Sequence, residues 1–173
     1  MHTMKSPPQN VHRAIARGLT AVLLGSALLF GAASTAHASN YALEEVPTLI
    51  PPDEAAKLRG AGVTTTFSLL EKGADQKSRK ALSAGVKVPL RALESWVKSC
   101  DLMRVRGVGP DVAKLLTAVG VLTVAELQRA DANKTADAIL KANAQQKLSE
   151  NPPSAEHLSA WIAQAKNLPI VLH

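Results

Sequence analysis

Apolar residues recur at helical spacing in short segments that are separated by Gly, Pro and Asn. One such segment opens at Pro110 and is followed by Gly120, and its apolar residues return every three or four positions: Val112, Leu115, Leu116 and Val119. This spacing puts them on one face of a helix, and a glycine commonly follows the last helical turn. Sustained alternation of apolar and polar residues, which indicates strands, is missing from the sequence. We therefore predict an all-α protein.

The sequence contains an internal repeat. A shift of 58 positions carries Pro52 onto Pro110 and also aligns Asp53 with Asp111, Ala55 with Ala113, Leu58 with Leu116, Gly62-Val63 with Gly120-Val121, Thr65 with Thr123 and Leu69 with Leu127. The match continues to Gly85 and Asn143, where we expect both copies to end a helix, because Gly and Asn adopt the left-handed conformation most readily. Self-similarity at a fixed spacing indicates two copies of one supersecondary unit.

The second copy carries an insertion of seven residues. The shift rises from 58 to 65 when Leu93, Trp96 and Val97 align with Leu158, Trp161 and Ile162, and the extra residues lie around Asn151-Pro152-Pro153. Each copy thus ends on a helix that bears a tryptophan. We expect both tryptophans in the core, on faces formed by Leu90, Leu93, Val97 and Cys100 and by Leu158, Trp161, Ile162 and Ala165. Stacking on bases is the alternative.

The helices of the second copy have recognisable starts. Thr123-Val124-Ala125-Glu126 has the spacing of a capping box, in which the Thr hydroxyl and the Glu carboxylate accept free amides at a helix start. Residues 131–142 and 154–166 supply two further helices. Together with the helices that begin at Pro110 and after Thr123, they give four short helices in the second copy.

The sharpest local motif is Val105-Arg106-Gly107-Val108-Gly109, just before the helix of Pro110. Two glycines permit a tight turn that exposes backbone amides at a helix N-terminus, where the helix dipole favours a phosphate oxygen. Val108 should hold the turn by packing into the core. The candidate phosphate or DNA contacts are Arg104, Arg106, Gly107, Val108, Gly109 and Lys114. The alternative is a purely structural turn.

The motif resembles helix-hairpin-helix modules, in which Gly-hydrophobic-Gly forms the hairpin and a small residue, here Ala113, lies where two helices touch. The stretches Cys100-Asp101-Leu102-Met103-Arg104 through Gly109 and Trp161-Ile162-Ala163-Gln164-Ala165 through Pro169 resemble a tandem helix-hairpin-helix family described only as a domain of unknown function. This resemblance covers residues 46–168. It implies two degenerate helix-hairpin-helix (SAM-like) repeats packed as one compact domain, and it implies no activity.

The N-terminal segment and the internal repeat divide the chain into five parts. We expect a signal peptide in residues 1–38, a lead-in in 39–48, a first repeat with a degenerate hairpin in 49–102, a second repeat with the intact hairpin in 103–168, and an apolar tail in 169–173 that either packs back or meets a partner.

Many helix-hairpin-helix modules bind duplex DNA without reading its sequence, but three features oppose this role here. Asp111 brings a carboxylate to the helix N-terminus that would hold the phosphate. In the first copy Leu49-Ile50-Pro51 replaces the glycine motif, and Pro51 has no amide to donate. The low aromatic content, 3%, provides no stacking platform for single strands. We therefore favour an unidentified protein partner, with the duplex DNA backbone as the alternative.

The N-terminal segment predicts export. Arg13 and Arg17 precede an uncharged stretch with an apolar core from Leu19 to Ala33, and Ala36-His37-Ala38 then forms an A-x-A cleavage site. An uncleaved anchor is the alternative. Either case places the remainder in the periplasm or outside the cell, and we expect no membrane span after cleavage.

Composition narrows the function further. Of the net charge of +6, three positive charges, Lys5, Arg13 and Arg17, lie in the export segment, so about +3 remains, which demands neither a nucleic acid nor a membrane.

Cys100 is the single cysteine, and we expect it to be buried and unreactive. We find no metal-spaced His or Cys cluster and no catalytic motif. The run Lys77, Arg79, Lys80 predicts a solvated helix face. We therefore expect neither a catalytic residue, a metal nor a cofactor, and hence a non-enzyme.

Overall fold

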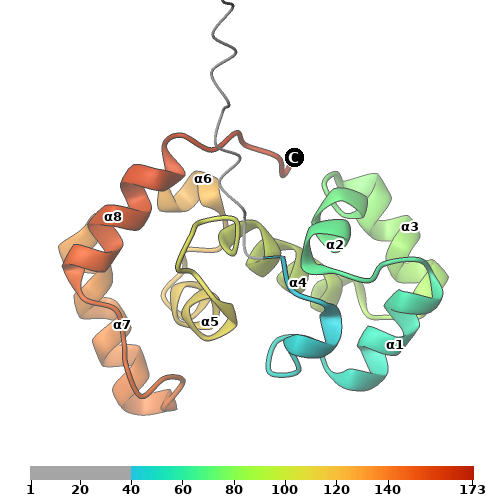
Figure 1. Cartoon of the computed structure of the whole chain (residues 1–173), viewed down its shortest axis with the longest axis horizontal. Helices are drawn as coiled ribbons and strands as arrows, with labels where there is room; N and C mark the ends of the chain where they lie inside the picture. The colour runs from blue at the N-terminus through green and yellow to red at the C-terminus, as the bar shows by residue number, and fades with distance from the viewer. Residues whose placement is uncertain (1–39) are drawn as a thin grey trace, which may run out of the picture. The chain divides into compact units, whose positions relative to one another are not determined.

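The computed structural model describes residues 40–173, which contain eight α-helices and one 3-10 helix (Figure 1). The elements are η1 (Leu43–Glu45), α1 (Pro52–Gly60), α2 (Thr66–Lys72), α3 (Gln76–Val86), α4 (Leu90–Leu102), α5 (Pro110–Ala118), α6 (Val124–Leu127), α7 (Ala132–Gln146) and α8 (Ala155–Ala165). One isolated bridge between Ala42 and Thr65 is the only β-type pairing in this range. The prediction of an all-α protein is confirmed. The predicted export segment lies outside the described residues.

The helices of the two halves pack in the same order. α1 packs on α3, and both α2 and α3 pack on α4; likewise α5 packs on α7, and both α6 and α7 pack on α8. Helix α4 also packs on α5 and α6, so it belongs to the packing of both halves. The helix-hairpin-helix interpretation of these halves remains a prediction.

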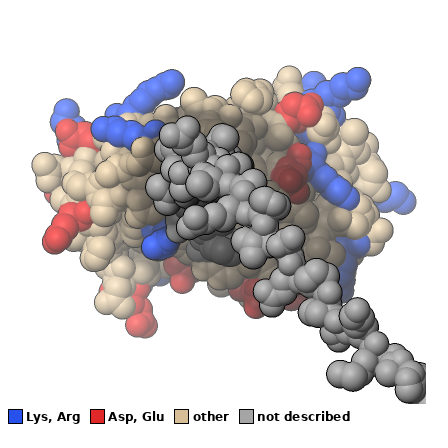
Figure 2. All heavy atoms as spheres, turned by 45° about the horizontal axis from the view of Figure 1, so that its top comes forward, with Lys and Arg blue, Asp and Glu red and all other residues tan. Residues whose placement is uncertain are grey.

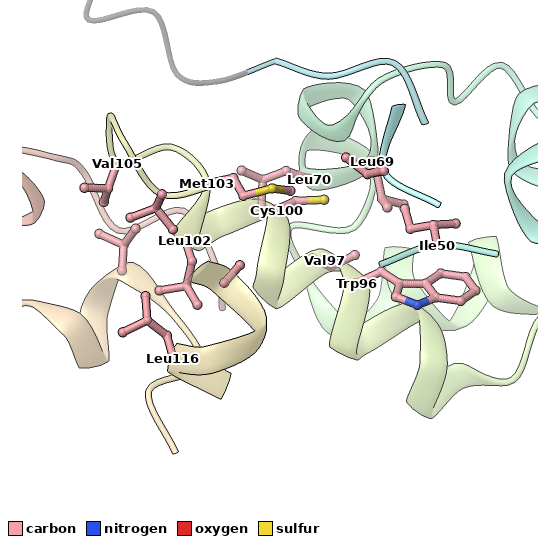
Figure 3. Packing of buried hydrophobic residues seen from close by; sticks show 14 of the residues in the cluster. Ile50, Leu69, Leu70, Trp96, Val97, Cys100, Leu102, Met103, Val105 and Leu116 are labelled. Carbon is pink, nitrogen blue, oxygen red and sulfur yellow. The ribbon is translucent and has the colours of Figure 1, made fainter. Parts of the chain in front are cut away.

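A single hydrophobic core runs through both halves along α4. Figure 3 shows Trp96 and Val97 beside Ile50 and Leu69 of the first half, whereas Leu102 lies toward Leu116 of the second. These side chains are buried, and so is Trp161 on α8. The predicted core placement of both tryptophans is therefore confirmed. Burying so many small aliphatic side chains removes apolar area from water, which is the main term that stabilises such a domain.

Helices α1 and α5 end in the same way. Gly62 and Gly120 adopt positive φ angles of 74° and 86°. The amide of the following valine then donates back to a leucine carbonyl, from Val63 to Leu58 and from Val121 to Leu116, each at 3.0 Å. This is the Schellman arrangement, in which a left-handed glycine lets the chain reverse onto the last turn.

The starts of α2 and α6 also correspond. The hydroxyls of Thr65 and Thr123 accept the amides of Ser68 and Glu126, and both starts are closed as capping boxes. The capping box predicted for Thr123 and Glu126 is thus confirmed.

The predicted ends of the third helices are wrong. Helices α3 and α7 run past Gly85 and Asn143, and the left-handed residues are Lys87 (φ 56°) and Lys147 (φ 49°). Asn143 instead remains helical and exchanges hydrogen bonds with Ser149: its amide group donates to the Ser149 carbonyl at 2.8 Å and its oxygen accepts the Ser149 amide at 2.9 Å. Its side chain therefore secures the inserted loop.

The C-terminal tail packs back on the first half. In Figure 1 the red end of the chain turns from α8 toward α2. The amide of His173 donates to the Ala74 carbonyl at 3.1 Å, and Arg79 donates to the carbonyls of Gly73, Ala74 and His173. Arg79 therefore holds the tail and lies only partly exposed, unlike the solvated residue that the charge run predicts.

Candidate functional site

The Gly-Val-Gly turn connects α4 to α5. The amide of Val108 donates to the Val105 carbonyl at 3.0 Å, and both valines are fully buried. Gly107 has a φ of 91°, a conformation that side chains disfavour, whereas Gly109 is the extended N-cap of α5 with a φ of −87°. Val108 thus holds the turn against the core, as predicted.

The first half keeps the buried residue of this turn but not its glycines. Ile50, which aligns with Val108, is also fully buried. Leu49 and Pro51 occupy the glycine positions, and Pro51 is the N-cap of α1. Exposed amides are therefore reduced in the first half, as the sequence indicates, while the packing function of the turn is kept.

Arg104 does not lie where a phosphate contact requires it. Its guanidinium donates to a carboxylate oxygen of Asp101 at 2.7 Å and to the carbonyl of Pro169 at 2.9 Å. The side chains of this pair are only 10% and 3% exposed. Because both interactions are internal, the structure argues against the DNA role predicted for Arg104 and assigns it to fixing the tail.

The other predicted contacts surround the start of α5 without forming a cationic cluster. Arg106 and Gly107 are exposed, and Gly109 and Lys114 are partly exposed. Asp111 is exposed in the first turn of α5. One exposed guanidinium and one carboxylate therefore stand near the amides that were predicted to hold a phosphate.

A groove lies beside this turn, and the sequence did not predict it. Its volume is about 600 Å³, and we name it the Trp161 groove after the tryptophan in its lining; the lining consists of Gly107, Val112, Glu150, Asn151, Pro152, Pro153, His157 and Trp161. The turn and the start of α5 form one wall, and the inserted loop with the start of α8 forms the other. The seven-residue insertion was the one sequence feature that pointed to this groove, but the sequence of the inserted loop does not show which part of the protein the loop faces.

Trp161 contributes a polar edge to this groove. The residue is 8% exposed, and a β-carbon placed on Gly107 would lie 3.0 Å from the indole Nε1. The His157 ring stacks against the indole, with 6.1 Å between centroids and 25° between planes. Within residues 40–173 the indole N–H has no hydrogen-bond partner, although it is not sealed from solvent. It is thus a donor without a partner among the described residues, in the lining of an open groove.

The charged residues of the groove are mostly acidic. Glu150 is in the lining, which contains no lysine or arginine. Asp111 and Glu156 are exposed in the first turns of α5 and α8, the two helices whose starts form the walls. Arg106, next to Gly107, is exposed as well. An anionic ligand would therefore meet more negative than positive charge.

The face drawn in Figure 2 is not continuously basic either. Figure 2 shows blue Lys and Arg side chains interspersed with red Asp and Glu side chains on the visible face. A mixed distribution of this kind creates a weak long-range field, in contrast to the basic stripe typical of DNA-binding surfaces.

Metal-binding residues do not gather at any place in residues 40–173. In the described part of the chain, no three His, Cys, Asp or Glu residues are placed to hold a metal ion. Cys100 is buried, and its burial raises the pKa of its thiol, with the Asp101 carboxylate adding to the effect. Over the same residues, no helix combines the length and apolarity needed to cross a membrane.

Comparison with known proteins gives one result. No curated protein and no solved structure matches the chain. The family model described as "Domain of unknown function (DUF4332)" matches residues 48–168, most of the region that the sequence resemblance covers. The chain therefore belongs to this family of domains of unknown function.

Proposed function

We propose that this chain is an exported, non-enzymatic interaction module that docks a protein partner in the Trp161 groove. The observation that supports it best is the free indole donor of Trp161 in an open, partly apolar groove. Concave sites with apolar walls and a few polar groups are typical of binding sites. Export follows from the A-x-A segment of the sequence and is part of the proposal.

The rigidity of the walls supports this proposal. The turn is held by the buried Val108, and the loop is held by the side chain of Asn143. A preformed site loses little conformational entropy when a partner binds, so a small groove can still bind specifically.

Sequence-independent binding of duplex DNA is the second candidate. It is favoured by Gly107, Gly109 and Arg106, which stand at the start of α5, with Lys114 one turn later. Asp111 at the same helix end, Glu150 in the groove and the internal position of Arg104 oppose it.

One pair of experiments separates the two functions. Fluorescence anisotropy with a labelled random-sequence duplex, at low and near-physiological salt, should show no binding by the purified, exported protein. Tight binding that weakens steeply with salt and is lost in Arg106→Ala would instead establish phosphate contacts.

Site-specific cross-linking in the native envelope tests docking directly. A photoreactive amino acid at His157, in the groove, should give a defined adduct, whereas the same group at Lys134, exposed at the start of α7, should not. Equal labelling from both positions, or none from His157, would count against docking in the groove.

A further inference from the structure

We infer that the Trp161 groove recognises an extended peptide segment that carries a lysine or arginine. This inference rests on the proposed docking function and adds the chemistry of the partner. It follows from two sources of hydrogen-bond donors in the groove, from the charge of its lining and from the difference between the two halves.

The first donor is the indole N–H of Trp161. An indole can only donate, and leaving it without an acceptor is costly when it is removed from water. Because the nitrogen lies beside Gly107 in the lining of the groove, a partner bound there must bring an acceptor to this point. Every residue of a peptide has a backbone carbonyl, so a peptide of any sequence can accept a hydrogen bond from the indole N–H.

The second source of donors is the start of α5. Pro110 is its first residue, Gly109 provides no side-chain cap, and Val112 in the first turn lines the groove. The free amides of a first helical turn carry partial positive charge and attract carbonyl oxygens. A chain lying along this wall can therefore offer one carbonyl to the indole and another to the helix start.

The charge of the groove selects the side chains of the partner. Glu150 in the lining and Asp111 and Glu156 at the helix starts outnumber the two nearby cations, Arg106 and Lys114. This balance of charge disfavours a polyanion. It favours a lysine or arginine on the partner, because such a side chain is attracted to the carboxylates at the edge of the groove. Pro152 and Pro153 supply an apolar wall that lacks amide donors.

The first half lacks this site although it keeps the tryptophan. Trp96 is as buried as Trp161, but Leu49 stands where Gly107 leaves the indole uncovered, and the inserted loop is missing. The features that open the groove therefore occur only in the second half. Trp96 consequently serves as an internal control.

The test follows the indole signals by ¹H–¹⁵N NMR in the purified, exported protein. The probes are two acetylated, amidated heptapeptides, Ala-Ala-Lys-Ala-Lys-Ala-Ala and its counterpart with Glu in place of both Lys. The Trp161 signal is assigned with Trp96→Phe and Trp161→Phe. The Lys peptide should shift the Trp161 signal downfield and leave the Trp96 signal in place, because only Trp161 gains an acceptor.

Substitution of one carboxylate tests the charge argument. Glu150→Gln should weaken binding of the Lys peptide about threefold, the effect expected for one solvent-exposed charge pair. Glu71→Gln, at an exposed site on α2, is the matched control and should leave the affinity unchanged.

Each other outcome overturns a stated part. A Trp161 shift with the Glu peptide, inorganic phosphate or duplex DNA, and not with the Lys peptide, replaces the basic peptide with an anion. If no probe shifts the signal while cross-linking from His157 persists, the peptide chemistry is wrong and docking stands. If both fail, the groove is not a docking site.

Discussion

The two glycines of the turn have different backbone conformations and therefore different tolerance to substitution. Gly107 is left-handed and faces the indole of Trp161, whereas Gly109 is extended, and a β-carbon there would meet only the Tyr41 hydroxyl at 3.7 Å. An added methyl group is strained in the first case and makes an ordinary contact in the second.

We predict that Gly107→Ala lowers the free energy of unfolding by about 1–2 kcal/mol, the cost of a left-handed backbone with a side chain. Gly109→Ala should change it by less than about 0.5 kcal/mol. Urea denaturation measures both. Equal losses in the two variants would contradict the backbone assignment of this turn.

Burial of Cys100 makes the stability depend on alkaline pH. Because the pKa of the thiol is raised in the folded state above its ordinary value of 9.0, folded and unfolded chains both keep the proton below that pH. Above pH 9 the Cys100 thiol ionises in the unfolded chain but stays protonated in the folded one, and this difference favours unfolding. Hence the unfolding free energy of the wild type relative to Cys100→Ala should be constant up to pH 8 and fall by about 1.4 kcal/mol per unit above pH 9.

Denaturation of both proteins at several pH values measures this difference, and the other titrating groups cancel in the comparison. A difference that stays constant to pH 10.5 would show that the thiol ionises equally in both states.

At the level of elements, Asp101 joins three parts of the second half. One carboxylate oxygen accepts the amide of Val124 at the start of α6 at 2.8 Å, and the other accepts Arg104, which in turn holds the tail at Pro169. In the first half the corresponding amide, that of Thr66, donates to the backbone carbonyl of Tyr41 at 2.9 Å. The same helix start is thus fixed by a charge in one half and by backbone in the other.

We predict that Asp101→Asn lowers the free energy of unfolding by about 3 kcal/mol, because Arg104 loses its partner in a nearly dry environment. The double variant Asp101→Asn/Arg104→Met should lose less than the sum of its single variants. A double-mutant cycle by urea denaturation measures this coupling. Additive losses would mean that the pair does not interact.

The sequence predicted the helices better than the site. Repeat positions such as Gly62/Gly120 and Thr65/Thr123 end or start helices through contacts with their nearest neighbours in sequence. Their roles could therefore be predicted from the sequence. The internal pairing of Arg104 and the end of α7 were not readable for a different reason: Arg104 bonds to the distant Pro169, and α7 runs past Asn143, whose side chain bonds to Ser149. The Trp161 groove combines two segments that only tertiary packing brings together.

At the scale of the whole domain, the tail connects the end of the second half to the first. Val171 and Leu172 pack against the core, and the backbone of His173 bonds to Ala74 and Arg79. The tail therefore adds to the contacts that α4 already provides between the halves.

Removing residues 169–173 should lower the free energy of unfolding by about 2 kcal/mol, from the lost apolar burial and hydrogen bonds. Unfolding should remain a single transition, because α4 still belongs to both halves. Coincident tryptophan fluorescence and circular dichroism curves test this, and separated curves would show that the tail alone couples the halves.

The starts of α2 and α6 are fixed by different acceptors, so the two acceptor residues should tolerate substitution to different extents. The carbonyl that Tyr41 offers to Thr66 belongs to the backbone, so replacing the Tyr41 side chain leaves the acceptor in place. The acceptor for Val124 is the carboxylate of Asp101, which a single substitution removes. Among relatives of this chain, position 41 should therefore accept other side chains that pack against the core, while changes at 101 should be rare or accompanied by changes at 104.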